Sequence, residues 1–192
     1  MNIVGLLLAA GSATRFGSDK LLHPLPHGVA IAVQAARHLG AHLPRIVAVV
    51  KPGDEALASR LRSEGCEVAV CEHSAQGMGA SLACAARAAG EADAYLVALA
   101  DMPFVRPASV AAVRDALASG AQLAAPYFRA RRGHPVGICG RFYSQLLALE
   151  GDEGARSVLQ GNPHLIVKIP VGDPGVIRDI DTPGDLMPPL SV

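Results

Sequence analysis

The stretch that decides the fold runs from Leu6 to Lys20 and reads LLLAAGSATRFGSDK. Its first half is a continuous apolar run, which is typical of a strand buried on both faces of a sheet. Its second half is a loop of small residues that carries two cations, Arg15 and Lys20. A buried strand that turns into such a loop predicts an α/β protein whose first loop can hold an anion.

Size, composition and charge limit the classes of protein to consider. The chain has 192 residues and is 51% hydrophobic, which suits one domain over residues 1–192 with a sizeable core. Lys and Arg together number 17, as do Asp and Glu, so the formal net charge is zero. Because a neutral chain offers no extended basic face, we expect neither nucleic acid nor a membrane as a partner.

The cysteines and the first apolar run indicate the compartment. Cys66, Cys71, Cys84 and Cys139 form no C-x-x-C pair and have no histidines at zinc-finger spacing. We therefore expect a reducing, cytoplasmic environment. The run Ile3–Ala10 has no Lys or Arg before it and is too short to cross a bilayer, so we expect a buried strand there rather than a signal peptide.

Apolar, strand-like runs alternate with helix-like segments. We expect strands at Asn2–Ala9, Arg45–Val50, Glu67–Cys71, Ala94–Ala100 and Leu123–Ala125. We expect helices at Val29–His42, Pro52–Glu64, Ala80–Ala89 and Pro107–Ser119. This alternation predicts a doubly wound, mainly parallel α/β sheet with a small antiparallel addition after about Pro126. Such sheets bind ligands at the carboxyl ends of their strands.

The loop after the first strand has the chemistry of an anion site. Gly11 and Ser12 are small enough for backbone N–H groups to approach an anion closely. The guanidinium of Arg15 can grip phosphate with two N–H groups, and Lys20 acts as a point charge. The loop contains neither G-x-x-x-x-G-K-[ST] nor G-x-G-x-x-G. An ordinary strand-to-helix turn with two solvated cations is the alternative.

Acidic residues stand where a divalent cation is expected. Asp101 is at the tip of the fourth expected strand, although it can also cap the turn at Pro103. Asp179 and Asp181 share one face of an extended segment, although a helix N-cap before Pro183 is also consistent. Two acidic tips and one cationic loop together fit a nucleoside triphosphate with Mg²⁺.

Three further polar segments have both a functional and a purely structural explanation. Gly79 and Ser81 allow a close ligand approach, or form a flexible lead-in to the next helix. His134 contacts a substrate or is a surface-loop histidine, and it has no partner at zinc spacing. Asp152 and Arg156 adjoin glycines, which also suits a capped helix start.

The combination of motifs resembles one known family. The first loop is similar to the L-A-A-G-x-S/A-x-R-F/M-G-x-x-K signature of MobA-like nucleotidyltransferases. Five later motifs resemble its branch of molybdenum cofactor cytidylyltransferases (MocA) in order and rough spacing. They read GMGASL (77–82), LADMPFV (99–105), RGHPVG (132–137), GDEGAR (151–156) and DIDTPGDL (179–186).

The resemblance implies a fold and a reaction. The fold is a Rossmann-like, three-layer nucleotidyltransferase fold. The reaction is Mg²⁺-dependent transfer of CMP from CTP to molybdopterin, giving molybdopterin cytosine dinucleotide and pyrophosphate. CTP and molybdopterin are then the small-molecule partners, and a transient contact with a molybdoenzyme or a cofactor-insertion chaperone stays open.

The resemblance also assigns roles to residues. It implies that catalysis depends on Arg15, Lys20 and Asp101. It implies a metal site at Asp101 and at the pair Asp179 and Asp181, with Asp181 favoured. It implies nucleotide contacts at Leu8, Ala9, Ala10, Gly11, Ser12, Arg15, Lys20, Gly79, Ser81 and Asp101. It implies acceptor contacts at Gly133, His134, Pro135, Asp152 and Arg156.

Two positions bear on specificity. The cytidylyl branch has L-A-A-G where the guanylyl branch usually has L-A-G-G, so the methyl group of Ala10 favours CTP. The family usually continues K-L-x-x-P-x-x-G-x-P-L-L after the lysine of its signature, but here Gly28–Ile31 replaces the G-x-P-L element. This departure leaves the identity of the acceptor open.

Other functions remain as alternatives. The same scaffold can transfer GMP from GTP to molybdopterin, or a nucleotide to another phosphorylated acceptor. A non-catalytic carrier of molybdopterin and a nucleotide-binding regulatory module are the alternatives outside catalysis. The three aspartates argue against a pure carrier, which has no need of metal-binding carboxylates.

Overall fold

The computed structural model describes residues 1–11, 16 and 19–187. Its strands form one eight-stranded sheet. They are β1 Ile3–Ala9, β2 Ile46–Val50, β3 Glu67–Val70, β4 Ala94–Leu99, β5 Leu123–Phe128, β6 Arg131–Arg132, β7 Val136–Cys139 and β8 Ile166–Pro170. The α-helices are α1 Ile31–Gly40, α2 Glu55–Ser63, α3 Met78–Ala89, α4 Pro107–Ala118, α5 Tyr143–Leu147 and α6 Arg156–Gly161.

The sheet is mainly parallel, as the sequence predicts. β1 pairs in parallel with both β2 and β4, and β2 pairs in parallel with β3. β7 is antiparallel to both β4 and β5, so β5 runs in the same direction as β4. β8 pairs in parallel with β5. The carboxyl ends of β1, β4, β5 and β8 therefore lie at one edge of the sheet, called the carboxyl edge below.

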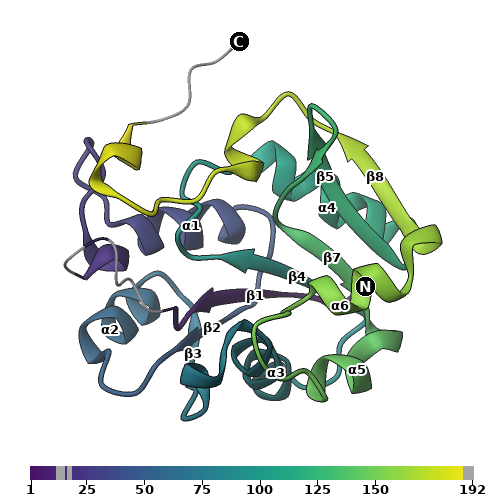
Figure 1. Cartoon of the computed structure of the whole chain (residues 1–192), viewed down its shortest axis with the longest axis horizontal. Helices are drawn as coiled ribbons and strands as arrows, with labels where there is room; N and C mark the ends of the chain where they lie inside the picture. Colours follow the sequence, from purple (N-terminus) through teal and green to yellow (C-terminus); the bar gives the residue numbers. More distant parts are fainter. Residues whose placement is uncertain (12–15, 17–18, 188–192) are drawn as a thin grey trace.

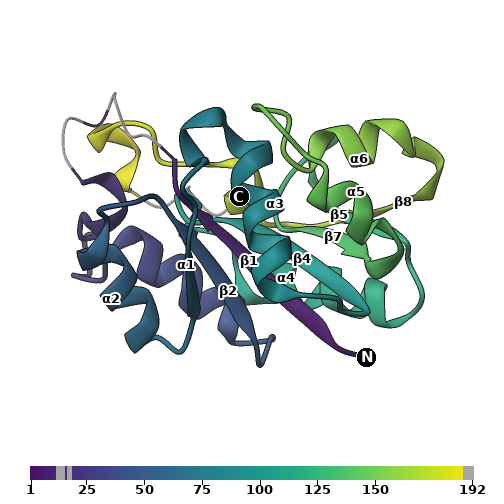
Figure 2. The same ribbon diagram turned by 90° about the horizontal axis from the view of Figure 1, so that it is seen from below.

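Helices cover both faces of the sheet (Figure 1; Figure 2). Each face packs against its helices through one hydrophobic cluster. α1, α2 and α4 bury their apolar side chains on one face, and α3, α5 and α6 bury theirs on the other. The five β1 residues from Val4 to Leu8 and most of β2 and β4 are almost fully buried. Burial on both faces explains why these strands are continuous apolar runs in the sequence.

A third, smaller cluster ties the first loop to the end of the chain. Phe16 packs with Leu25, Ile31 and Ile180, all of which are buried. These residues come from the loop after β1, the start of α1 and the segment after β8. The cluster brings segments that are distant in sequence together at the carboxyl edge.

The segment that departs from the family pattern forms a short closed loop before α1. Leu25 N donates to Val29 O over 2.8 Å, and Gly28 N donates to Leu25 O over 2.7 Å. Pro24 and Ala30 form an isolated antiparallel bridge. Gly28 has a φ of +87°, a conformation that glycine adopts at little cost. This loop, α1 and α2 line a groove of about 500 Å³.

None of the helices in the described residues combines the length and the hydropathy that crossing a bilayer requires.

The tight hairpin between β5 and β6 is built from two non-glycine residues in the left-handed region. Arg129 has a φ of 47° and Ala130 a φ of 64°. Two-residue hairpins favour this geometry because its twist matches that of the strands, but they normally use Asn and Gly. Each side chain raises the free energy of the turn because its Cβ crowds the backbone.

Replacing Ala130 with glycine should therefore stabilise the protein. We expect A130G to raise the free energy of unfolding by about 0.5–1 kcal/mol, since glycine removes the Cβ penalty. Urea unfolding measures the change. As a control, A112G within α4 should lower the free energy by about 1 kcal/mol, and destabilisation by A130G would contradict the account.

Candidate functional site

Three charged side chains from different parts of the chain meet at the carboxyl edge. Lys20 Nζ donates to Asp101 Oδ2 over 2.9 Å and lies 3.8 Å from Asp181 Oδ1. Lys20 opens the 3-10 turn Lys20–Leu22, Asp101 follows β4, and Asp181 precedes the 3-10 turn Pro183–Leu186. The sequence predicts all three as site residues, and the structure brings them together.

Backbone hydrogen bonds hold these segments side by side. Ala100 N donates to Leu8 O over 3.0 Å, so the turn after β4 lies against the end of β1. Ile180 N donates to Asp101 O over 2.9 Å, which fixes the neighbouring Asp181 beside Asp101. Backbone hydrogen bonds therefore bring the segments that carry the three charges together, in addition to the contacts between their side chains.

Burial makes this charge cluster unusual. Lys20 is only 9% exposed, and a buried ammonium group is costly unless it is paired. Two carboxylates face one ammonium group, so acidic groups outnumber basic groups in this cluster. Asp101 and Asp181 therefore direct hard oxygen ligands at one point, as a divalent cation requires. Among the described residues, no group of three or more His, Cys, Asp or Glu side chains forms a complete metal site.

Asp179 and Asp181 are both exposed, and the intervening Ile180 is buried. Of the two carboxylates, Asp181 is the one that forms an ion pair with Lys20 in the described part of the chain. The N-cap expected before Pro183 is Thr182, which forms a reciprocal capping box with Asp185. The geometry supports Asp181 over Asp179 as a partner of Asp101.

The first loop is described in part. Leu8, Ala9 and Ala10 are buried at the end of β1, whereas Gly11 is exposed. A Cβ added to Gly11 would meet nothing within 4 Å, so its backbone faces open space. Ser12 and Arg15 lie outside the described residues, and their assigned roles stay predictions.

The start of α3 packs against the loop that precedes α6. Gly79 N donates to Gly151 O over 2.6 Å, and Ser81 Oγ donates to Gly77 O over 3.2 Å. A Cβ on Gly77 would come within 2.3 Å of Asp152 Oδ1. The sequence analysis places Gly79 and Ser81 on the nucleotide side and Asp152 on the acceptor side, but here the two segments form one contact. The N–H group of Gly79 and the hydroxyl group of Ser81 are therefore both hydrogen-bonded to other parts of the protein.

The segment Gly133–His134–Pro135 is held at the carboxyl edge by the backbone. His134 N donates to Val176 O over 2.8 Å, and a Cβ on Gly133 would come within 2.2 Å of the same oxygen. Burial lowers the pKa of His134, and the charge of Arg132 lowers it further, while a backbone hydrogen bond to Val97 and the charge of Asp101 oppose these effects. The imidazole is therefore neutral at pH 7 and lies within electrostatic range of Asp101.

The remaining acceptor-side predictions lie at the start of α6. Asp152 and Arg156 are both exposed, and neither forms an ion pair within the described ranges. Exposure is consistent with a ligand contact and equally with a solvated helix start.

The sequence matches the MobA-like NTP transferase domain over residues 5–166, which is most of the chain. The chain belongs to the MobA-like NTP transferase family. Its fold is the Rossmann-like nucleotidyltransferase fold of that family.

Several known proteins are similar to this family member over almost all of its length. Nicotine blue oxidoreductase from Paenarthrobacter nicotinovorans is 29% identical over 188 residues, which is 94% of this chain and 92% of that protein. The crystal structure of Rv0371c from Mycobacterium tuberculosis H37Rv superposes with a TM-score of 0.81 at 26% identity, covering 96% of this chain and 94% of that one. A complex of Rv0371c with manganese superposes with a TM-score of 0.79 at 24% identity, covering 96% of each chain.

In this MobA-like protein, the buried carboxylate of Asp173 lies outside the charge cluster but connects segments that adjoin it. Asp173 is 3% exposed and accepts hydrogen bonds from Arg106 N (2.8 Å), Ser109 Oγ (2.7 Å) and Gly175 N (2.9 Å). Asp173 thereby joins the start of α4 to the 3-10 turn Pro174–Ile177. The carbonyl of Val176 in this turn accepts the hydrogen bond from His134 N. The sequence analysis does not single out Asp173, although an Asp before a Pro is a helix-start signal.

A variant that removes this carboxylate should be markedly less stable. We expect D173A to lower the free energy of unfolding by about 2–4 kcal/mol, because three donors, two of them in buried hydrogen bonds, lose their acceptor. Urea unfolding measures the loss. S109A removes one of the three donors and should cost about 1 kcal/mol, and a D173A loss no greater than that of S109A would refute this role for Asp173.

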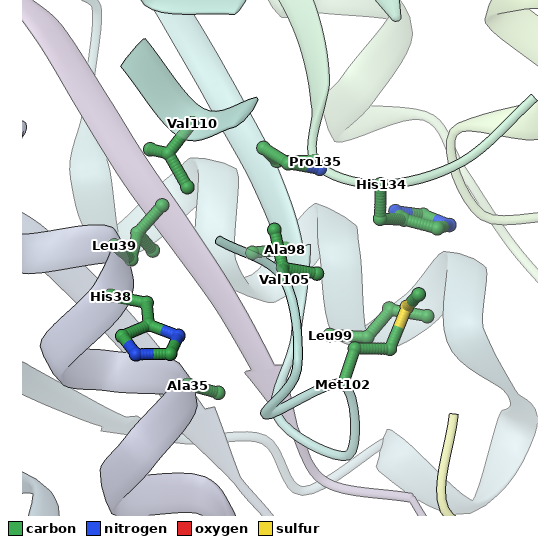
Figure 3. Close-up of a pocket in the computed structure, with 10 residues that line it drawn as sticks. All are labelled: Ala35, His38, Leu39, Ala98, Leu99, Met102, Val105, Val110, His134 and Pro135. Carbon is green, nitrogen blue, oxygen red and sulfur yellow. The ribbon is translucent and has the colours of Figure 1, made fainter. Parts of the chain in front are cut away.

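A small cavity lies between α1 and the turn after β4 (Figure 3). Its volume is about 20 Å³, which is space for about one water molecule. His38 and His134 approach it from α1 and from the segment before β7. The Nδ1 atoms of both rings are buried and make no hydrogen bond to the described residues.

Burial also lowers the pKa of His38, and the charge of His27 adds to this effect, while a backbone hydrogen bond to Val105 and the charge of Asp173 oppose it. The unfolded chain therefore binds protons more readily than the folded chain as the pH falls below about 6.5. Burial of His38 and of His134 thus makes the folded state less stable in mild acid.

The pH dependence of unfolding tests this consequence. We expect the free energy of unfolding to fall between pH 7 and pH 5.5, with each histidine contributing at most about 1.4 kcal/mol per pH unit. H38Q should make the fall smaller, because it removes one of the two buried titrating groups. H164Q replaces an exposed histidine and should leave the slope unchanged. An H38Q slope equal to that of the unmodified protein would count against the burial effect.

Proposed function

We propose that this protein transfers CMP from CTP to molybdopterin, producing molybdopterin cytosine dinucleotide and pyrophosphate. The observation that carries the proposal is the convergence of Lys20, Asp101 and Asp181 at the carboxyl edge, directly beside the end of β1. A cation next to two carboxylates suits a nucleoside triphosphate bound together with a divalent metal. Ala10, which is buried at the end of β1, is the feature that favours CTP over GTP.

The chemistry follows from the charges of the substrates. An oxygen of the acceptor's phosphate attacks the α-phosphorus of CTP, a new P–O bond forms, and the bond to the β-phosphate oxygen breaks to release pyrophosphate. The attacking phosphate is already ionised at neutral pH, so the reaction needs no strong general base. Catalysis then consists of positioning the reactants and neutralising charge.

Lys20 and Arg15 have the electrostatic roles in this proposal. The ammonium group of Lys20 exchanges part of its contact with Asp101 for an oxygen of the departing pyrophosphate. Arg15, assigned through its position in the family signature, contributes a second positive charge to the same group.

The metal proposed for the site is Mg²⁺. When bound, it supplies charge neutralisation at the α-phosphate. Asp101 and Asp181 would hold it, because their oxygens already converge on one point beside the first loop. The manganese complex of Rv0371c is consistent with a divalent cation in a protein of this fold.

The acceptor is proposed to lie on the β5–β7 side of Asp101, along Gly133–Pro135, Asp152 and Arg156. The neutral ring of His134 close to Asp101 supports this placement. The four free cysteines of the described residues support a cytoplasmic location. A molybdoenzyme or a cofactor-insertion chaperone is the proposed recipient of the product.

Redox chemistry is the competing activity, because one similar protein is a nicotine blue oxidoreductase. Nicotine blue oxidoreductase is similar over almost the whole chain, so its activity is the second candidate. The paired carboxylates and buried lysine favour phosphate chemistry, because a hydride or electron transfer has no need of a divalent-metal site of this kind.

A turnover assay tests the proposed reaction. Protein, Mg²⁺ and molybdopterin are incubated with CTP or GTP, and pyrophosphate release is followed. We expect release with CTP to exceed release with GTP, and CTP with Mg²⁺ to raise the melting temperature more than GTP with Mg²⁺. Release with GTP alone would reassign the nucleotide. Absence of release with either nucleotide, together with redox turnover of nicotine blue, would favour the oxidoreductase alternative.

Variants of the charge cluster test the roles of its members. We expect K20A and D101A each to lower kcat by about 10²–10³-fold while the protein still folds, because each removes a charged group that stabilises the transition state. Pyrophosphate release measures the loss, and circular dichroism checks the fold. D179A is the matched control, since Asp179 is exposed two residues from Asp181, and it should retain turnover within a few fold. Near-normal turnover of K20A or D101A would refute the assigned role.

A further inference from the structure

Two of the cysteines, Cys71 and Cys84, lie against each other between the sheet and α3. Cys71 directly follows the edge strand β3, and Cys84 lies in the middle of α3. Cys71 Sγ donates to Ala80 O over 3.7 Å, and Cys84 Sγ donates to Val70 O over 3.9 Å. The two thiols therefore make reciprocal contacts, each with the segment that carries the other.

These contacts bring the two sulfur atoms together. Val70 O belongs to the peptide bond that leads into Cys71, so Cys84 Sγ lies beside the backbone of Cys71. Ala80 precedes Cys84 by four residues in the helix, so its carbonyl faces the N–H group of Cys84. Cys71 Sγ therefore lies beside the backbone of Cys84. The two thiols are also hydrogen-bonded to each other.

The two thiols differ in their access to solvent. Cys84 is half-buried, whereas Cys71 is only 2% exposed. A small oxidant can therefore reach Cys84, and Cys71 is the adjacent thiol that can complete a disulfide. Among the described residues, neither Cys66 nor Cys139 makes a hydrogen bond to another thiol. The pair Cys71 and Cys84 thus differs from the other cysteines in having two sulfurs in contact.

We propose that Cys71 and Cys84 form a site of reversible oxidation, where a small disulfide such as glutathione disulfide converts the two thiols into an intramolecular disulfide that weakens nucleotide binding. The formation of this bond is independent of the proposed function, whereas its effect on nucleotide binding rests on that function.

The oxidation consists of two exchange steps. The thiolate of Cys84 attacks one sulfur of glutathione disulfide, so that a mixed disulfide forms and one glutathione leaves. The thiolate of Cys71 then attacks the Cys84 sulfur, and the second glutathione leaves. The two protons of the cysteine thiols pass to the two departing thiolates. The cysteines lose two electrons in total, and glutathione disulfide is reduced to two molecules of glutathione.

The new bond would close the loop that carries two of the proposed nucleotide contacts, Gly79 and Ser81. A disulfide holds its sulfurs about 2.05 Å apart, which is closer than two thiols in hydrogen-bond contact. Cys71 is anchored in the sheet, because Cys71 N donates to Val50 O over 2.9 Å. The approach of the sulfurs therefore displaces the start of α3, where Gly79 N donates to Gly151 O over 2.6 Å. Such a displacement moves Ser81 relative to the end of β1 and weakens a ligand that contacts both.

The surroundings of the pair make the oxidation slow. Burial raises the pKa of the Cys84 thiol, and the hydrogen bond and charge of Cys71 raise it further, while the charge of Arg87 opposes these effects. Because the thiolate is the form that reacts, only a small fraction of Cys84 is reactive at neutral pH. We expect the exchange to take hours, so the site responds to a lasting change in redox conditions.

Mass spectrometry of the full chain tests whether the bond forms. The reduced protein is incubated with glutathione disulfide, and we expect its intact mass to fall by two hydrogens with no glutathione attached. Trypsin and a Glu-specific protease cleave after Glu67, Glu72 and Arg87, so Cys71 and Cys84 fall in different fragments. The disulfide should keep these two fragments joined. Separate fragments, or glutathione retained on Cys84, would overturn the proposal.

Serine variants assign the two steps to their residues. C84S should form no intramolecular disulfide, and C71S should stop after the first exchange and retain one glutathione on Cys84. C139S is the matched control, because Cys139 is half-buried like Cys84 but lies on β7. C139S should form the disulfide as the unmodified protein does. Loss of the disulfide in C139S, or its formation in C84S, contradicts the assignment.

Calorimetric titration with CTP and Mg²⁺ tests the effect on binding. We expect the oxidised protein to bind CTP about three- to tenfold more weakly than the reduced protein, and dithiothreitol to restore the affinity. C84S treated with glutathione disulfide should bind CTP as it does before treatment. Equal binding by the oxidised and reduced forms of the unmodified protein would overturn the proposed control of nucleotide binding.

These measurements separate the oxidation site from the proposed reaction. If the reduced protein binds GTP in place of CTP, the nucleotide is reassigned, and the same comparison with GTP tests the effect of the disulfide. If the reduced protein binds neither nucleotide, the proposed function and the effect on binding both fail, and the mass measurement decides whether the disulfide itself forms.

Discussion

The candidate site depends on one partly buried ion pair, the contact of Lys20 with Asp101, and Asp181 approaches the same ammonium group. Lys20 is almost fully buried, and such a charge is stable there only because carboxylates surround it. The pairing links the first loop, the turn after β4 and the segment before the turn Pro183–Leu186, which are 80 or more residues apart in sequence. The parallel sheet makes this possible, since it delivers the ends of β1, β4 and β8 to one edge.

The sequence alone predicts much of this arrangement, for physical reasons. Strands buried on both faces are apolar throughout, so β1, β2 and β4 are found within one or two residues of their expected limits. The helix expected from Val29 begins at Ile31 because Val29 and Ala30 instead close a short loop through hydrogen bonding and a bridge to Pro24. Asp101 is predictable because a polar residue at the end of an apolar strand lies at the ligand edge. Lys20 is predictable from the cationic loop of small residues, and Asp181 from its two-residue spacing with Asp179.

Other features depend on long-range contacts that a local pattern does not encode. The expected antiparallel addition is present, but its place between β4 and β5 is set by pairing of Val136 with Val97. The short helices α5 and α6 have too few residues for a clear period. Gly79 and Ser81 have the composition of a ligand loop, yet their N–H and hydroxyl groups bond to Gly151 and Gly77.

The most direct measurement of the central claim is a crystal structure with CTP and Mn²⁺, using the anomalous scattering of manganese to locate the metal. The account predicts a single strong peak bridging Asp101 and Asp181, the triphosphate over the end of β1, and Lys20 Nζ within hydrogen-bond distance of a phosphate oxygen. A bound nucleotide with the manganese peak away from both carboxylates, or with Lys20 still paired to Asp101 alone, would contradict it.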